Sequence, residues 1–565
     1  MLLQDYENIE RFLEGENGLT DLIASAFMDD GSYFEGASNY MMLVAELLFS
    51  ICNAAENFGV NLKDRFIPAA YDNQILHAPW AQSRGLDGED KPFLGMSFRR
   101  DQQVRSPIRK IKEYYDSLLL LLTPQGILLS ANDSNEKYLV SVMEKAYYLH
   151  HDRRYLTITE TAEHKDLLFG RHMAESETLS SGLQSINNTG NGFAVLRTQV
   201  KDDGGCQGFL QAVLKYGQHG GYHGHYDRLS LLSVIKDNRT FHNMEYAWFG
   251  YQSFLFKMWV QTSVAHNMVV VDGKMQEPTP CKCIYFHTAE RFTAACAQTI
   301  SRWSDPPYGG QTPYPEAFPE EKCEKEGRYI LPAPVPRKQG EIGEYSEPIF
   351  QRRLLVLYDG WCFVWDYEEA SEEHTFDCIY HPLGEASIEG LSDPEYTTRF
   401  DSNPYGAGQF ITLCGWYEGK EIVKIITNNT AKEDSGNVME YVKWSELYRL
   451  YPTSGEVMIG RYPQSVDTFT CEEIEMGDMA TRHQTMLADN SKKTVSFRQT
   501  GKSVRFVTAL AIDRGRDGIC KIESQGYDNI VIEYDTGRRI RIRIEGMDSK
   551  ETESLSVKIE KLAEQ

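Results

Sequence analysis

The sequence lacks the features that would place this protein in a membrane or on nucleic acid. Its 565 residues contain no apolar run of about 18 residues, the length that a membrane-spanning helix needs. The 82 acidic residues outnumber the 58 basic ones, which gives a formal net charge of −24. A negative excess of this size repels phosphate backbones and anionic lipids. We therefore expect neither nucleic acid nor a membrane among its partners.

Disulfide and targeting signals are also scarce. The 11 cysteines are scattered and odd in number, and the pair Cys281-x-Cys283 has no matching second pair. This pattern indicates reduced thiols in a core rather than a disulfide framework. The segment from Met1 to Glu7 has neither the basic part nor the apolar part of a secretory signal. From these two absences we expect a cytoplasmic protein.

Helical and β patterns occupy different parts of the chain. Apolar residues at helical spacing predict helices at 39–58, 107–122, 138–149 and 160–169, with an irregular segment at 66–106. Short alternating runs predict strands at 193–200, 229–235, 268–271, 351–357, 362–367 and 504–511, and a hairpin of 529–534 and 538–545. Such segregation predicts an α+β multidomain fold, with a helical domain at 1–190 and antiparallel β domains at 191–565.

The most informative segment is rich in glycine and histidine. It reads Lys215-Tyr216-Gly217-Gln218-His219-Gly220-Gly221-Tyr222-His223-Gly224-His225-Tyr226-Asp227. Glycines let the backbone lie close to whatever the segment faces. Because His223 and His225 are two residues apart, just before a predicted strand, we expect their side chains on the same face.

A second signature follows, and the two together resemble a known family. It reads Ser263-Val264-Ala265-His266-Asn267-Met268-Val269-Val270-Val271-Asp272-Gly273. The pair resembles the heparinase II/III-like polysaccharide lyase superfamily, which includes oligo-alginate lyases. That family has a Gly-His-Gly-His-x-Asp run followed by Ala-His-Asn and Val-Val-Asp-Gly, and Tyr222 here replaces its usual glycine. Weaker likeness extends the match over residues 29 to 385.

The resemblance implies both an architecture and an activity. The fold would be an incomplete (α/α) toroid followed by an antiparallel β-sandwich, with a toroid shorter than in relatives. The activity would be that of a lyase acting on an anionic oligosaccharide or polysaccharide that contains uronic acid. Alginate, heparan sulfate, chondroitin and hyaluronan are the substrates it suggests. Cleavage by β-elimination would leave a 4,5-unsaturated uronate end, and a homodimer is left open.

The chemistry of such a reaction sets requirements on the site. The proton on C5, next to the carboxylate, is only weakly acidic, so the site must first neutralise that carboxylate. It then needs a base near C5 and an acid near the leaving oxygen O4. Asn and His suit the first task because they hydrogen-bond the carboxylate. Tyr suits the others when nearby positive charge lowers its ordinary pKa of about 10.

The resemblance assigns these roles to particular residues. His223 matches the first histidine of the family's His-Gly-His and would neutralise the carboxylate or act as base. Asn39 would contact the carboxylate from the helical domain, and Tyr40 would contact the substrate, where some relatives have His. Tyr138 is the candidate catalytic tyrosine, although its spacing from Asn39 matches relatives only if residues 66–106 are discounted. Tyr71 is a rival.

Several relatives hold a zinc ion in the sandwich, and the resemblance carries its ligand positions to this chain. His225 and His266 match two of the ligands, and Asn243 stands where the family has Asp. Asn is a weaker, neutral ligand for Zn²⁺. Looser binding, a different ion and a hydrogen-bonded cluster without metal therefore stay open. In each case the cluster would have a structural role, supporting the backbone that presents His223.

Tyr246 and Trp248 could stack on sugar rings or pack at a sandwich edge.

Two other interpretations of the function remain. A glycoside hydrolase would need two carboxylates facing one bond, for which Glu35 and Asp133 are candidates. A carbohydrate-binding relative without catalytic activity is the third reading, favoured by the short toroid and by Asn243.

Overall fold

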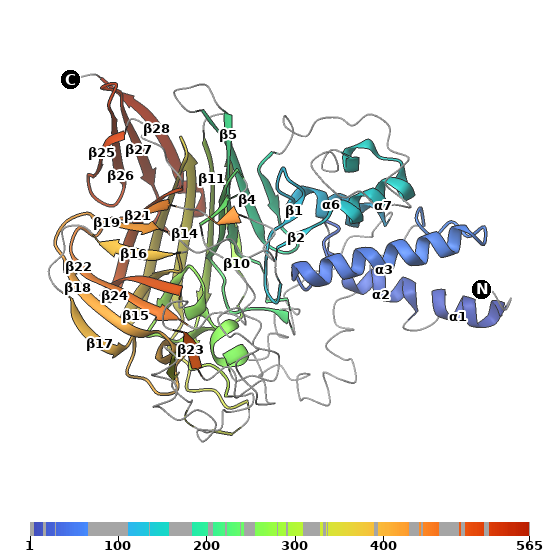
Figure 1. Ribbon diagram of the computed structural model, residues 1–565, viewed down its shortest axis with the longest axis horizontal. Helices are drawn as coiled ribbons and strands as arrows, with labels where there is room; N and C mark the ends of the chain where they lie inside the picture. The colour runs from blue at the N-terminus through green and yellow to red at the C-terminus, as the bar shows by residue number, and fades with distance from the viewer. Residues whose placement is uncertain are drawn as a thin grey trace. The chain divides into compact units, whose positions relative to one another are not determined.

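The computed structural model of the protein divides into two compact units (Figure 1). The first contains Met1–Phe193 and Gly217–Gly224, and the second contains Ala194–Tyr216 and His225–Gln565. The structure describes residues 5–14, 18–28, 30–65, 111–134, 136–156, 184–201, 207–217, 219–220, 223–237, 239–241, 255–279, 281–289, 292–308, 328–330, 335, 337–338, 340–382, 384–388, 394–428, 440–441, 444–462, 485–487, 492–512 and 519–563.

The described part of the first unit is mainly helical. Its helices are α1 (Tyr6–Glu14), α2 (Leu19–Ala26), α3 (Ser38–Glu56), α6 (Lys112–Leu121) and α7 (Val140–His150). The helices predicted at 39–58, 107–122 and 138–149 are confirmed as α3, α6 and α7, and the one at 160–169 lies outside the described residues. None of the described helices is long and apolar enough to cross a membrane.

Helix α3 is held by the two later helices, which lie beside it in Figure 1. One face of α3 buries residues at helical spacing, among them Met41, Ala45 and Leu48. The Tyr115 hydroxyl of α6 donates to the Ala45 carbonyl at 2.8 Å, and the hydroxyl of Tyr114 donates to that of Met41. These bonds fix α3 along its length and hence the position of its first turn.

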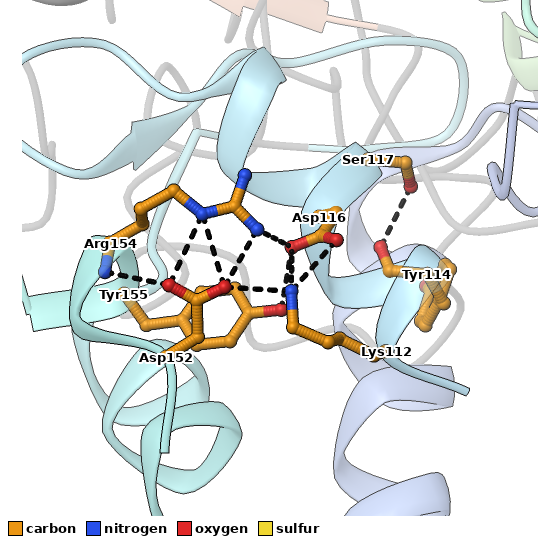
Figure 2. A network of polar contacts seen from close by, with 7 residues as sticks. All are labelled: Lys112, Tyr114, Asp116, Ser117, Asp152, Arg154 and Tyr155. Atoms are coloured by element: carbon orange, nitrogen blue, oxygen red, sulfur yellow. Dashed lines mark hydrogen bonds and ion pairs between the residues drawn. The ribbon is translucent and has the colours of Figure 1, made fainter. Parts of the chain in front are cut away.

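A network of ion pairs and hydrogen bonds links α6 to the residues that follow α7 (Figure 2). Asp152 accepts from Lys112 and Arg154 at 2.7 Å each, and Asp116 accepts from the Tyr155 hydroxyl at 2.7 Å. The hydrogen bonds from Arg154 outweigh burial and, with Lys112, hold the pKa of Asp152 well below its usual range. The network joins α6 to the turn after α7, at the partly exposed surface of the unit.

The second unit is built around one large antiparallel sheet. Its main strand order is β10 (Cys281–Thr288), β11 (Phe292–Ser301), β14 (Ile349–Tyr358), β15 (Trp361–Tyr380), β24 (Lys492–Ile512), β21 (Trp444–Tyr451), β19 (Val423–Asn428) and β16 (Glu385–Ile388). Off this path, β8 (Val269–Val271) pairs with β15, and β17 (Glu395–Arg399), β18 (Thr412–Gly419) and β22 (Gly455–Tyr462) continue from β24. Figure 1 shows β14, β15 and β24 side by side.

Two smaller sheets accompany the large one. The first has the order β20 (Glu440–Tyr441), β7 (Arg239–Thr240), β6 (Ser230–Lys236), β5 (Gln207–Lys215) and β4 (Phe193–Lys201). The second has the order β25 (Ile519–Ser524), β26 (Asn529–Tyr534), β27 (Arg539–Glu545) and β28 (Ser556–Leu562). Short strands complete the described set: β1 (Ile127–Leu128), β2 (Lys137–Tyr138), β3 (Ile186–Asn188), β9 (Met275–Gln276), β12 (Trp303–Ser304), β13 (Arg328–Ile330) and β23 (Thr485–Leu487).

The large sheet is buried on both faces, which makes the second unit three layers thick. On β14, Leu355 and Leu357 join the core shared with β4, β5 and β6, whereas Leu354 and Val356 join the core shared with β26 and β27. Successive side chains of a strand point to opposite faces, so the part of a strand that packs between two layers is apolar at successive positions. This explains the apolar run from Leu354 to Leu357 in β14.

The strand predictions are confirmed in β4, β6, β8, β14, β15, β24 and the hairpin β26–β27. The α+β multidomain class, with mainly antiparallel strands after the helices, is confirmed as well. The toroid and the division after residue 190 stay predictions. The contact pattern adds one feature that the sequence did not show, since residues 217–224 pack with the helical unit.

Candidate functional site

The glycine-rich segment brings His223 into the helical unit. Gly220 has φ +82°, and a Cβ there would lie 2.1 Å from the carbonyl oxygen of Glu35. A Cβ on Gly217 would lie 1.7 Å from the carbonyl oxygen of Asn191. Only glycine fits at either point, because any side chain would push the segment away from the unit. The spacing of the glycines therefore serves to seat the histidine that follows them.

His223 forms a buried pair with Asp133. Its Nδ1 lies 3.0 Å from Asp133 Oδ2, and the backbone N–H of Asp133 donates to the His223 carbonyl at 3.3 Å. The Asp133 side chain is fully buried, whereas the His223 side chain keeps 14% of its surface exposed. The ring of Tyr40, from the first turn of α3, stacks on the imidazole at 3.7 Å between centroids and 22° between planes.

This arrangement fixes what the imidazole can do. A carboxylate accepts hydrogen bonds, so the proton of a neutral His223 sits on Nδ1, facing Asp133. Its Nε2 then carries a lone pair that can accept a proton, and the nearby carboxylate stabilises the imidazolium that results. The stacked Tyr40 ring restricts rotation of the imidazole about its side-chain bonds. The His223 imidazole is thus held in a defined orientation.

Asn39 lies next to this pair, at the start of α3. Its backbone N–H donates to Ser134 Oγ at 2.9 Å, and the N–H groups of Tyr40 and Met41 are bonded to the Ala37 carbonyl. The backbone N–H groups at these positions are therefore already bonded, and only side chains can bind a ligand there. The Asn39 Oδ1 is buried and has no hydrogen-bond partner among the described residues.

A second amide in the same unit is also unsatisfied. Both amide atoms of Asn191 are buried without a hydrogen-bond partner in the described part of the chain. Asn191 lies on one side of Gly36 and Asn132 on the other, each within 3.7 Å of where a Gly36 Cβ would be. Buried polar groups are rarely left unsatisfied in proteins, and those that are often have a functional role. Asn191 gave no signal in the sequence, since it belongs to none of the motifs.

The structure places the remaining predicted residues less closely. Tyr138 lies on β2 opposite Ile127 of β1, with 52% of its surface exposed, and its catalytic role stays a prediction. Tyr71, Asn243, Tyr246 and Trp248 lie outside the described residues.

His225 belongs to a different cluster from His223, and the prediction that both lie on one face of a strand is wrong. Strand β6 begins only at Ser230, so the two histidines lie on irregular backbone where alternation does not apply. His225 Nδ1 lies 3.0 Å from His266 Nε2, within the second unit. The Nδ1 of His266 donates to the Thr262 carbonyl at 2.7 Å.

A buried ion pair completes this second cluster. Lys215 Nζ bonds Asp227 Oδ1, with side chains 1% and 0% exposed, and Asp227 Oδ2 lies 3.6 Å from His266 Nε2. Burial lowers the pKa of His266 to about 4, so this ring is neutral at physiological pH. Burial opposes ionisation of Asp227, but Lys215, His266 and His225 together outweigh it and hold the pKa of that carboxyl well below its usual range.

The described residues do not by themselves form a metal site. His266 uses its Nε2 lone pair to accept a hydrogen bond from His225 Nδ1, and Lys215 already supplies the positive charge beside Asp227. Among the described residues no three His, Cys, Asp or Glu side chains are grouped so that they could hold a metal ion. Zinc at this cluster stays a prediction that depends on Asn243.

The second signature links strands of the second unit. Asn267 donates to the Leu231 carbonyl at 3.1 Å, accepts from the His381 N–H at 2.8 Å, and its own carbonyl accepts from Arg353 at 2.6 Å. Arg353 in turn forms a buried two-bond ion pair with Asp366 at 2.6 and 3.0 Å. The Asn of Ala-His-Asn therefore joins β6, β14 and the end of β15.

Comparisons with known proteins agree with this architecture. No family model matches the chain, and no curated protein matches its sequence. A solved heparinase III matches with a TM-score of 0.50 at 11% identity, over 96% of this chain and 61% of its own. The heparan sulfate lyase HepC from Pedobacter heparinus gives 0.48 at 10%, over 96% and 61%, and another heparinase III gives 0.46 at 10%, over 96% and 62%.

The match to the first of these structures confirms the expected likeness at the level of the fold. The chain is similar in fold to heparinase III, and it spans about three fifths of the length of the structures it matches. Identity this low carries no residue roles from one protein to the other.

Proposed function

We propose that this protein is a polysaccharide lyase that cleaves a uronic-acid glycan by β-elimination. The observation that carries the proposal is the Asp133–His223 pair with the ring of Tyr40 stacked on it. The pair provides a directed base, and Asn39, the residue before Tyr40, carries an amide N–H that can donate to a carboxylate. These are the group types that removal of a proton next to a carboxylate requires.

The first step is neutralisation of the uronate carboxylate. The Asn39 amide donates a hydrogen bond through its Nδ2 to a carboxylate oxygen. That bond strengthens as the electron pair from the C5–H bond moves toward the carboxylate. The amide needs no change of protonation to do this, so it acts at any pH where the substrate is ionised.

The second step is elimination. His223 accepts the C5 proton on Nε2, the C5 electron pair forms the C4–C5 double bond, and the C4–O4 bond breaks with its electrons on O4. The leaving oxygen takes a proton from an acid, for which Tyr138 is the candidate. The imidazolium formed at His223 is stabilised by Asp133 and later returns its proton to water. No oxidant or further reactant is consumed.

The competing assignments have less support. A hydrolase that used Asp133 as one of its two acids would need that carboxylate to face the substrate, yet Asp133 is fully buried and bonded to His223. A protein that only binds carbohydrate would have no use for a buried carboxylate that directs an imidazole.

The fold likeness to heparinase III makes heparan sulfate the first substrate to test, followed by chondroitin, hyaluronan and alginate. The net charge of −24 favours short oligosaccharides over long polyanions, because a long anionic chain would be repelled along most of its length.

The decisive experiment measures ultraviolet absorbance of the unsaturated uronate product. Wild type, His223→Ala and Tyr148→Phe are compared on oligosaccharides of the four glycans, with Tyr148 as a partly exposed control on α7. We expect absorbance to rise on one glycan with wild type and the control, and to vanish with His223→Ala. New reducing ends without the chromophore would establish a hydrolase. Neither signal on any glycan would leave a binding protein.

A further inference from the structure

Arg228 in the second unit is a buried charge with no hydrogen-bonded counter-ion among the described residues. The side chain is 1% exposed, and its Nε, Nη1 and Nη2 have no hydrogen-bond partner in the part of the chain that the structure describes. Burial lowers its pKa, but only to about 10, so the guanidinium stays charged at neutral pH. A buried charge that is neither paired nor hydrogen-bonded is strongly unfavourable.

The acidic groups near Arg228 are already engaged elsewhere. Asp227 and Glu277 both interact electrostatically with Arg228. Asp227 Oδ1 is bonded to Lys215, and Glu277 accepts two bonds from Arg302, at 2.6 and 2.9 Å. Three cations therefore share two carboxylates, and the positive charge left over is that of Arg228.

The neutral groups around it cannot supply the missing charge. Burial raises the pKa of the Cys281 thiol to about 12, although Arg228 opposes this shift, and burial raises the pKa of Tyr226 as well. Both groups are thus protonated at neutral pH. Neither accounts for the guanidinium, since none of its nitrogens is hydrogen-bonded to them.

A further unsatisfied donor lies on the strand pair that adjoins Glu277. Trp303 of β12 pairs with Gln276 of β9, the residue before Glu277. The Trp303 side chain is fully buried, and its Nε1 has no hydrogen-bond partner among the residues described. An indole Nε1 can only donate, as can a guanidinium. The side-chain oxygen Oε1 of Gln276 in the same strand pair is likewise buried without a partner among the described residues, so what distinguishes the region is its surplus positive charge.

We propose that Arg228 is the core of an internal binding site for one oxyanion, a sulfate or a carboxylate. A guanidinium presents two parallel N–H groups that match two oxygens of such an anion, and bidentate pairs of this kind are the strongest that arginine forms. The anion cancels the surplus positive charge and accepts hydrogen bonds from the Arg228 nitrogens. The site does not depend on the proposed lyase activity, because Arg228 takes no part in the elimination.

The test is calorimetric titration of the full-length protein with sodium sulfate, against sodium chloride at equal ionic strength. We expect one saturable site for sulfate in the wild type and none for chloride at the same concentrations. Acetate in place of sulfate measures the preference between the two oxyanions. Wild type without a saturable site for either oxyanion would overturn the proposal, whatever the variants do.

Three variants locate the site. Arg228→Met should lose the sulfate site, and Arg228→Lys, which keeps the charge but not the fork, should bind at least about tenfold more weakly. Arg449→Met is the matched control, because Arg449 is also 1% exposed but donates to the carbonyls of Gly455 and Glu421. Unchanged binding by Arg228→Lys and Arg228→Met would show that the anion binds elsewhere and would contradict the proposal. If Arg228→Met does not fold, Arg228→Lys decides.

A competition experiment identifies the source of the anion. A sulfated disaccharide of heparan sulfate is added to the wild type at saturating sulfate. Displacement of one equivalent of sulfate means that the site receives a group carried by a glycan. Retention of the sulfate means that it holds a free ion. Both results require the site and differ only in what fills it.

Discussion

Two histidines separated by a single glycine belong to two different kinds of site. His223 is partly exposed and is oriented by the buried carboxylate of Asp133. The ring of Tyr40 stacks on it, and Asn39, the residue before Tyr40, has an amide oxygen without a partner among the described residues. His225 is buried, bonded to His266, and backed by the ion pair of Lys215 and Asp227. The Asn39 amide oxygen beside the first cluster has no partner among the described residues, whereas the second cluster is built from bonds among its own members.

This difference shows how one short motif can serve function and fold together. Unused capacity beside a directed imidazole is what a substrate can exploit, and a neutralised buried cluster is what a stable core requires. The comparison leads to two expectations that experiments can test. Changes in the first cluster should affect activity, and changes in the second should affect stability.

Replacing Lys215 should have the largest effect on stability. Lys215→Met leaves Asp227 as an unpaired charge in the core, which we expect to lower the free energy of unfolding by about 3 to 5 kcal/mol. Lys112→Met, in the partly exposed network of Figure 2, should cost about 1 kcal/mol or less. Urea unfolding followed by circular dichroism measures both. Equal losses would show that burial does not distinguish the two ion pairs.

Removing the imidazole of His223 should have the largest effect on activity. We expect His223→Ala to lower kcat by about 10³-fold, because the base is lost, while the midpoint of urea unfolding changes little. The measurement is the initial rate of ultraviolet absorbance, with unfolding as the companion assay. A loss of stability as large as that of Lys215→Met would contradict the division between the two clusters.

Asp133→Asn tests the direction of the imidazole with almost no change in volume. An amide can present its N–H to Nδ1 and thereby move the proton of His223 to Nε2, which can no longer accept the substrate proton. We expect kcat to fall by about 10²-fold with KM nearly unchanged. A purely structural Asp133 would lower stability and leave kcat nearly unchanged.

The smallest expected effect concerns pH and a third histidine, His374 of β15. Its two ring nitrogens lie 2.7 Å from Asp272 and 3.0 Å from Glu347. Burial lowers the pKa of His374, but these two carboxylates outweigh it and the net shift is upward.

A raised folded-state pKa means that the protonated ring stabilises the folded protein. This stabilisation is fully present below the unfolded pKa of about 6.5 and is lost as pH rises through the folded pKa. Thermal unfolding at several pH values should therefore show wild type losing its advantage over His374→Gln above about pH 6.5. A constant difference between the two proteins across that range would show that His374 does not titrate as inferred.

The sequence by itself determined three of the described helices, several of the central strands and some of the residues to examine. Apolar spacing was enough to predict α3, α6, α7 and the central strands, because burial on one or both faces imposes a period on the chain. The glycine and histidine run marked His223 without any structure. Asp133 was named only as an acid in a loop, since nothing local indicates which distant side chain a carboxylate will meet.

Tertiary structure decided how these residues are grouped. Strand alternation suggested one face for His223 and His225, but backbone outside a sheet has no such period, and the chain passes from one unit to the other between Gly224 and His225. The pairings of Asp133 with His223 and of Lys215 with Asp227 depend on contacts between segments up to 90 residues apart, and so does the absence of a hydrogen-bond partner for Arg228 among the described residues. Burial gives these contacts their energetic weight, and burial is fixed only when the whole chain has folded.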